Sequence, residues 1–340
     1  MKKMTCLMLL AFVISGCAVL VSASADDAVK PSAADRDAAR SAKVTRHALP
    51  AKTERGDSFR SAPSLGQRAS QASPAASSAD SQGLRYPGDL QYHGGAVLES
   101  TESHAIYMLP NGVCPVGTCW GNPERFLRDI GDSNFVHVVD QYVGLHSDDR
   151  YTVGRRAHVN FTPQSTPFTD NDMLAIVHAV AAKTGQTGYG HMYHVFLPQG
   201  TDECFDTTFS VCYSPDNFNT WFFCAYHGSA DFSDIGHVIY SVEPYQNVRG
   251  CSVRPNTPNG QLVDSTNNVL SHELIEAITD PDGDAWWNSA DNGLFGQEIG
   301  DECSFVIPQF FDPSNVRLDE NRYAIQPEYS NSVHACATGP

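Results

Sequence analysis

Eight cysteines spread between residue 114 and the C-terminus constrain this 340-residue chain more than any other feature. Their number is even and they lack the paired short spacings of a zinc ribbon, which favours up to four disulfides formed in an oxidising compartment. Cys114–Cys119 and Cys204–Cys212 are the expected pairs, because short loops close at low entropic cost. The pairing of the other four stays open. The sequence therefore predicts a disulfide-stapled, exported domain.

Residues 1–25 are expected to form an export signal. Lys2 and Lys3 precede an apolar run from Cys6 to Val21, and small residues suited to signal-peptide cleavage end at Ala25. A box resembling that of bacterial lipoproteins ends at Cys17, so acylation of Cys17 is the alternative. The protein is thus predicted to be secreted, periplasmic or lipid-anchored, with membrane contact only through an N-terminal lipid or signal anchor. Its oligomeric state is left open.

Charge divides the chain into two parts. Residues 1–88 hold 12 Lys and Arg against 7 Asp and Glu, whereas residues 89–340 hold 10 against 32. The second part repels phosphate backbones, so nucleic acid is not an expected partner. Such a density of carboxylates suits cation binding, calcium included, although a merely soluble acidic surface explains most of these side chains equally well.

Residues 26–84 are rich in Ala and Ser, with Phe59 as their only aromatic residue. Because they offer little apolar surface to offset chain entropy, we expect a disordered tether. Residues 85–340 are long enough for one large folded domain.

The expected elements of this domain alternate between helices and strands. Helices are expected over Asn122–Ile130, Thr169–Lys183 and from Asp264–Thr266 to Asp280; strands are expected over Phe135–Val143, Met192–Leu197 and Val238–Val242. This order predicts an α/β or α+β fold, a single domain with a mixed sheet. A zincin-like domain with an active-site helix is what the motif on the third helix implies, through its resemblance to a zincin signature.

The third helix carries the residues most suggestive of chemistry. His272 and Glu276 are four residues apart, so their side chains leave the same face of the helix, and Glu273 follows the histidine directly. The arrangement resembles the zincin signature HExxH, with Glu276 in place of the second histidine. It predicts Zn²⁺ held by His272 and Glu276, with Glu273 activating the metal-bound water. The extra carboxylate shifts the preference towards harder cations.

A metal site of this kind needs a third protein ligand, and Glu298 and Asp301 are the candidates. The layout resembles that of gluzincins, in which a downstream glutamate completes the site, so Glu298 is the expected ligand and Asp301 its support. His227 is expected to polarise a transition-state oxygen. The alternative is that His272 and Glu273 are ordinary helix residues.

Asp280, Asp282 and Asp284 form a second candidate cation site directly after the helix. The run resembles the start of an EF-hand loop, although its glycine is fourth rather than sixth. A calcium site is therefore one reading, and a solvated turn rich in aspartate is the other.

Several of these segments resemble the phosphate-induced protein (EXORDIUM-like) family. The opening Tyr92–Leu98 is similar to the start of that family, and Phe223–His227, Asn267–Pro281 and the EIGD-x-C motif are similar to its bacterial members. The resemblance covers about residues 90–305. It implies an extracellular protein. The plant members, which it implies are associated with growth, lack the His-Glu pair.

Together these features predict an exported metal-dependent hydrolase, a peptidase, acting on a peptide or a cell-surface polymer. The first alternative is a non-catalytic extracellular EXORDIUM-like binding or signalling protein with a structural calcium ion. The second is a carbohydrate-active enzyme that uses Glu273 and Glu298 as paired carboxylates.

Overall fold

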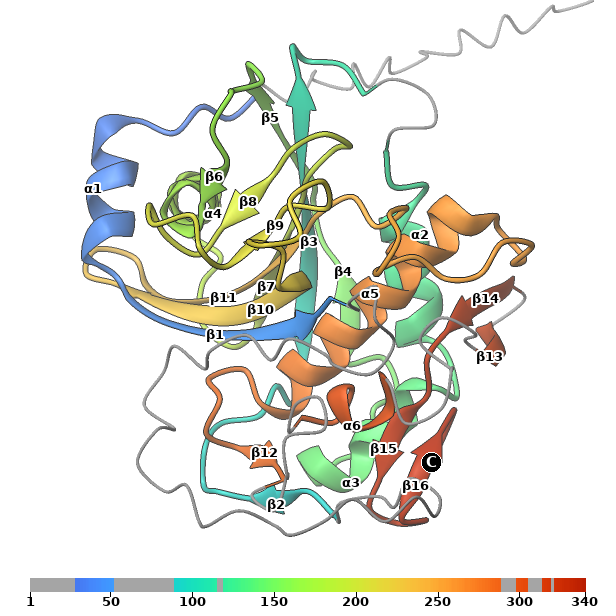
Figure 1. Cartoon of the computed structure of the whole chain (residues 1–340). Coiled ribbons are helices and arrows are strands. Elements are labelled where there is room, and N and C mark those ends of the chain that lie inside the picture. The colour runs from blue at the N-terminus through green and yellow to red at the C-terminus, as the bar shows by residue number, and fades with distance from the viewer. Residues whose placement is uncertain (1–27, 52–88, 115–118, 289–297, 305–313, 319–320) are drawn as a thin grey trace, which may run out of the picture.

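The computed structural model describes residues 28–51, 89–114, 119–288, 298–304, 314–318 and 321–340. The strands of its main sheet are β1 (Lys43–Pro50), β3 (Thr101–Pro110), β4 (Tyr151–Val153), β5 (Ala157–Phe161), β7 (His191–Phe196), β10 (Phe223–Phe232) and β11 (Gly236–Glu243). They lie in the order β1-β10-β11-β7-β3-β4, and β5 also pairs with β3 (Figure 1). The β1–β10 and β10–β11 pairs are antiparallel and the others are parallel.

Helices and short strands surround this sheet. The helices are α1 (Ala33–Ser41), α2 (Pro123–Gly131), the 3₁₀ helix η2 (Val136–Val139), α3 (Asp140–Val143), α4 (Asp170–Thr184), α5 (Gln261–Thr279) and α6 (Asp301–Ser304). The short strands are β2 (Gln91–Tyr92), β6 (Phe168–Thr169), β8 (Glu203–Cys204), β9 (Cys212–Tyr213), β12 (Trp286–Trp287), β13 (Ser314–Leu318), β14 (Asn321–Ile325), β15 (Glu328–Ser330) and β16 (Ala335–Ala337). They form the small sheets β2–β12, β6–β8–β9, β13–β14 and β15–β16.

The main sheet has an apolar core on each face. Because side chains alternate along a strand, Ile106 and Tyr193 belong to the core that includes α1 and α4, whereas Ala105 and Met192 belong to the core that includes α2 and α5. Figure 1 shows α1 and α4 on one side of the sheet and α5 on the other. The predicted mixed α/β class is confirmed.

Five of the six expected elements are present, as α2, α4, α5, β7 and β11. Helix α2 begins with Pro123 after Asn122, whose side chain accepts a hydrogen bond from the amide of Arg125. Helix α4 begins with a capping box, in which the amide and hydroxyl of Thr169 donate to Asp172. Because these capping residues are visible in the sequence, both helices could be predicted from it.

The prediction of a disordered tether over residues 26–84 is wrong for its first part. Residues 33–50 form α1 and β1, and β1 pairs with β10 along its length. Arg46 pairs with the buried Asp170, and Leu49 is fully buried. The segment is ordered because its backbone hydrogen bonds and apolar contacts come from distant residues, which composition alone does not reveal. Residues 52–84 lie outside the described part of the chain, as does the expected export signal.

The predicted strand over Phe135–Val143 is also wrong. The segment is helical, with η2 followed by α3, and Gly144 ends it with a positive φ of 72°. Val136, Val138 and Val139 are all buried. A short apolar run of this kind suits a buried helical turn as well as a strand, and here packing decides in favour of the helix.

Four disulfides staple the domain. Cys114–Cys119 and Cys204–Cys212 confirm the two expected pairs, and Cys224–Cys251 and Cys303–Cys336 complete the set. Four such bonds suit an oxidising, extracellular environment. Within the described residues, none of the helices combines the length and apolar character needed to cross a membrane.

Candidate metal centre

Helix α5 positions the predicted motif in the interior of the protein. It packs against β10 and β11 on one side and β14 on another (Figure 1). It begins at Gln261, earlier than expected, because Asp264 and Ser265 accept hydrogen bonds from Asn259 and Val253 inside the first turns rather than capping the helix. It ends at Thr279, and Asp280 caps it as expected. Since every residue from 264 to 279 is buried, its polar side chains must meet other polar groups.

His272, Glu276 and Asp301 form the first such group. His272 Nε2 lies 3.1 Å from Glu276 Oε1 and 3.8 Å from Asp301 Oδ1. One potential ligand atom from each residue lies within 4.8 Å of the others, and all three residues are buried. One imidazole and two carboxylates are a ligand set that zinc accepts, and the two carboxylates neutralise the charge of a divalent cation.

The opposite side of Glu276 belongs to a second group, formed with His227 of β10 and Glu273. His227 Nδ1 lies 3.2 Å from Glu273 Oε2 and 3.5 Å from Glu276 Oε2. These three residues are also buried and satisfy the same 4.8 Å criterion. Glu276 is therefore shared, with one oxygen facing each histidine.

Glu298 and His47 extend this cluster towards β1. Glu298 Oε2 lies 3.1 Å from His47 Nδ1, and Glu298 Oε1 lies 3.7 Å from His227 Nε2. The side chain of His47 is 14% exposed, against 4% for Glu298 and none for His227. His47 is thus the most solvent-accessible of the residues in these contacts. We call these seven residues the buried cluster: His47, His227, His272, Glu273, Glu276, Glu298 and Asp301.

Several polar atoms of the buried cluster are left unsatisfied. Among the described residues, Glu273 Oε1 and Glu298 Oε1 have no hydrogen-bond partner, and His272 Nε2 makes no hydrogen bond beside its 3.1 Å contact with Glu276 Oε1. An unsatisfied buried polar atom costs about 1–3 kcal/mol, more if it is charged. A divalent cation would satisfy such atoms by coordination.

Burial also sets the protonation of these groups. It lowers the pKa of His272, and it lowers that of His227 to about 4, so both imidazoles are neutral at pH 7. Burial, followed by the nearby carboxylates, raises the pKa of Glu273 and Glu276 well above the usual range. Neutral imidazole is the form of histidine that binds metals, and a bound cation would restore the charged form of the carboxylates.

The segment after residue 297 fits closely around the ligands. The amide of Asp301 donates to Glu276 Oε1 at 3.0 Å, and the Ser304 hydroxyl faces His272 Nδ1 at 3.5 Å. A Cβ at Gly300 would lie 2.5 Å from His272 Nδ1 and 2.9 Å from Glu276 Oε1. Only glycine lets this backbone approach the two side chains without displacing them.

The sequence therefore located most of the buried cluster. His272, Glu273, Glu276, Glu298, Asp301 and His227 are brought together as expected, but their roles differ in detail. Asp301, not Glu298, joins His272 and Glu276 in one group, and Glu298 contacts His47 and His227 instead. His47 was missed because it lies in the expected tether, where no local pattern marks it.

The three aspartates of the predicted calcium site do not direct their side chains at one point. Asp280 Oδ1 accepts the amide of Ala285, and Asp282 contacts His237 and Tyr189. Asp284 is exposed and lies against Gly95. These three aspartates, all within the described residues, are not among the groups whose ligand atoms lie within 4.8 Å of one another. The segment is better described as a hydrogen-bonded turn, in which Asp280 is fully buried and Asp284 is exposed.

No protein-family model, no curated protein and no solved structure matches the chain. The resemblance to the EXORDIUM-like family and the zincin-like identity of the fold stay predictions.

Proposed function

We propose that this protein is an exported metal-dependent hydrolase acting on peptide bonds, with the buried cluster as its active centre. The observation that carries the proposal is the convergence of His272, Glu276 and Asp301, from two separate segments, with unsatisfied polar atoms in the interior. HExx strings occur often by chance, so the proposal rests on Asp301, a carboxylate from a separate segment that lies 3.8 Å from His272 Nε2. The four disulfides support export.

In the proposed mechanism His272, Glu276 and Asp301 would hold a zinc-class cation, which would supply Lewis-acid chemistry by lowering the pKa of water and polarising the scissile carbonyl. Glu273 acts as the general base. One of its oxygens faces His227 at 3.2 Å and the other has no hydrogen-bond partner among the described residues. The free oxygen is thus available to accept the proton of the attacking water.

His227 serves in this proposal as a positioning residue for the base. Its Nδ1 faces Glu273, and its Nε2 lies 3.4 Å from the backbone oxygen of Asp280 and 3.7 Å from Glu298. Both ring nitrogens are therefore directed at protein groups. This replaces the role expected from sequence, in which His227 polarised a transition-state oxygen.

Glu273→Gln tests the proposal, because it removes the base while keeping the size of the side chain. The variant is expected to keep its metal and to lose at least about 100-fold in hydrolysis of casein or a peptide library. Glu203→Gln is the matched control, since Glu203 is a fully buried glutamate packed beside Tyr226 on the other face of the sheet. Equal activity of Glu273→Gln and the wild type would sink the mechanism.

A second candidate function follows from the burial of the ligands. His272 is fully buried, and Glu276 and Asp301 are 1% and 6% exposed. Such enclosure suits a closed structural metal site in a non-catalytic extracellular binding protein. In that case the wild type would retain a tightly bound cation that raises its Tm, yet it would hydrolyse neither peptides nor polysaccharides.

A further inference from the structure

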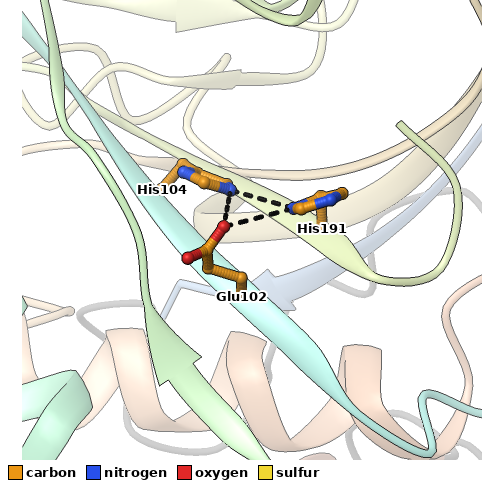
Figure 2. Close-up of side chains that lie close together, drawn as sticks. All are labelled: Glu102, His104 and His191. Atoms are coloured by element: carbon orange, nitrogen blue, oxygen red, sulfur yellow. Dashed lines mark hydrogen bonds and ion pairs between the residues drawn. The ribbon is translucent and has the colours of Figure 1, made fainter. Parts of the chain in front are cut away.

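A separate group of potential ligands lies at the start of two central strands. Glu102 and His104 belong to β3 and His191 begins β7, and Figure 2 shows their side chains pointing toward one another. In the parallel β3–β7 pair, Glu102 is opposite His191 and His104 is opposite Tyr193. Tyr193 belongs to the core on the α4 side of the sheet. The group is thus on the face opposite to helix α5 and the buried cluster.

The distances within this group match a metal site. His104 Nε2 lies 3.1 Å from His191 Nδ1 and 3.3 Å from Glu102 Oε2, and His191 Nδ1 lies 3.5 Å from Glu102 Oε2. Zinc binds nitrogen and oxygen at about 2.0–2.2 Å in tetrahedral geometry, which separates neighbouring ligand atoms by about 3.3–3.5 Å. The three side chains would therefore need little rearrangement to bind an ion.

Surrounding groups hold the ligands in place. His104 Nδ1 lies 3.2 Å from the backbone oxygen of Arg155, so it donates there and leaves the lone pair of Nε2 facing Glu102 and His191. Gln186 donates to Glu102 at 3.0 Å. Partners of this kind are what orient metal ligands in known sites.

Gly154 allows the backbone to close over the group. A Cβ at this position would lie 2.2 Å from His104 Cε1 and 2.8 Å from Glu102 Cδ. The close approach fixes the two β3 side chains from one side. On the other side the group is open to solvent, because the side chains of Glu102 and His191 are 34% and 26% exposed.

We propose that Glu102, His104 and His191 form a second metal site, which binds one zinc-class divalent cation through two imidazoles and one carboxylate. The fourth position faces solvent and takes water or a small anionic ligand. The site joins the starts of β3 and β7 and is independent of the buried cluster. The competing explanation is a histidine pair that shares a hydrogen bond and binds no metal.

The test is a titration of the chelator-treated full chain with Co²⁺ and Zn²⁺, following the visible spectrum of Co²⁺ and the bound equivalents. His191→Ala and Glu102→Ala remove partly exposed ligands, so folding should survive in at least one of them. Each is expected to lose one equivalent, or to bind it at least about 100-fold more weakly, since even a supporting residue contributes about 10–100-fold.

Two control variants separate this site from the others. His272→Ala removes a ligand of the buried cluster and is expected to abolish a different equivalent. His146→Ala alters the exposed group His137, His146 and Asp148 and is expected to leave the cobalt spectrum unchanged. The proposal is overturned if His191→Ala and Glu102→Ala bind cations as the wild type does, or if His146→Ala removes the same equivalent. If His191→Ala and Glu102→Ala each lose an equivalent while His272→Ala binds cations as the wild type does, the second site stands and the proposed function fails.

Discussion

His47 and His227 lie directly opposite each other in the β1–β10 ladder, and their rings stack with centroids 5.2 Å apart. A strand from the N-terminal region therefore supplies one member of the buried cluster. His47 also holds Glu298 at 3.1 Å, which links this strand to the segment that carries Asp301.

This relationship predicts that His47→Ala destabilises the protein. Glu298 would lose the partner of one oxygen in a buried setting, at a cost of about 1–3 kcal/mol in the free energy of unfolding. Denaturant unfolding followed by circular dichroism measures the change. His146→Ala is the matched control, because its pair with Asp148 is exposed, and it should cost under about 0.5 kcal/mol. Equal effects of the two variants would contradict a structural link through His47.

Asp301→Asn and Glu298→Gln distinguish the third ligand of the proposed cation. Asp301 shares a group with His272 and Glu276, so its loss should weaken Zn²⁺ binding more than the loss of Glu298. Calorimetric titration of Zn²⁺ into the chelator-treated protein provides the comparison. A larger loss in Glu298→Gln would restore the assignment expected from the sequence.

Gly300→Ala should damage the same centre without changing any ligand. The added methyl group would overlap His272 and Glu276, at a cost of about 1–3 kcal/mol in stability and with weaker metal binding. Gly190→Ala serves as the control, because a Cβ there meets nothing within 4 Å. If Gly300→Ala bound Zn²⁺ with wild-type affinity, the close packing of residue 300 on the ligands would be refuted.

The disulfide Cys303–Cys336 is expected to support metal binding as well as stability. It ties α6, which begins at Asp301, to the C-terminal strand β16. Replacing both cysteines with alanine should lower the free energy of unfolding by about 2–4 kcal/mol and reduce Zn²⁺ affinity. The double alanine variant of Cys204 and Cys212 should lower stability but keep the affinity. If both double variants bound Zn²⁺ with the same affinity, the Cys303–Cys336 disulfide would have no specific role in metal binding.

The pair of His237 and Asp282 predicts a pH-dependent part of the stability. Their side chains lie 3.1 Å apart. Burial raises the pKa of Asp282, but hydrogen bonds from His237, Ser229 and Tyr189 outweigh it and lower this pKa to about 2. The hydrogen bond to Asp282 in turn raises the pKa of His237. The carboxylate contributes stability that is present above its unfolded pKa of 3.8 and lost towards pH 2. The imidazole contributes stability that is present below 6.5 and lost as the pH rises through its folded value.

The pair therefore stabilises the fold most between about pH 4 and 6.5. Thermal unfolding of Asp282→Asn and the wild type from pH 3 to 9 should show the largest Tm difference near pH 5. A difference that is the same at pH 5 and pH 9 would exclude the charged pair as its cause.

Sequence reasoning predicted those parts of the molecule that are marked by residues close together in the chain. Helix α4 has a capping box at Thr169, and the spacing of His272 and Glu276 places both on one face of α5. The position of β1 had no such signal, because its partner β10 is far away in sequence. The group of Glu102, His104 and His191 was missed for the same reason, since the β3–β7 pairing alone brings His191 to the other two.

The claim that the buried cluster holds a divalent cation is tested most directly by metal analysis of the purified full chain and of His272→Ala, before and after chelation. We predict that the wild type carries an equivalent that His272→Ala lacks, that chelation lowers the Tm of the wild type, and that Zn²⁺ restores it. Identical metal content in both proteins, with a wild-type Tm indifferent to chelation, would contradict the account.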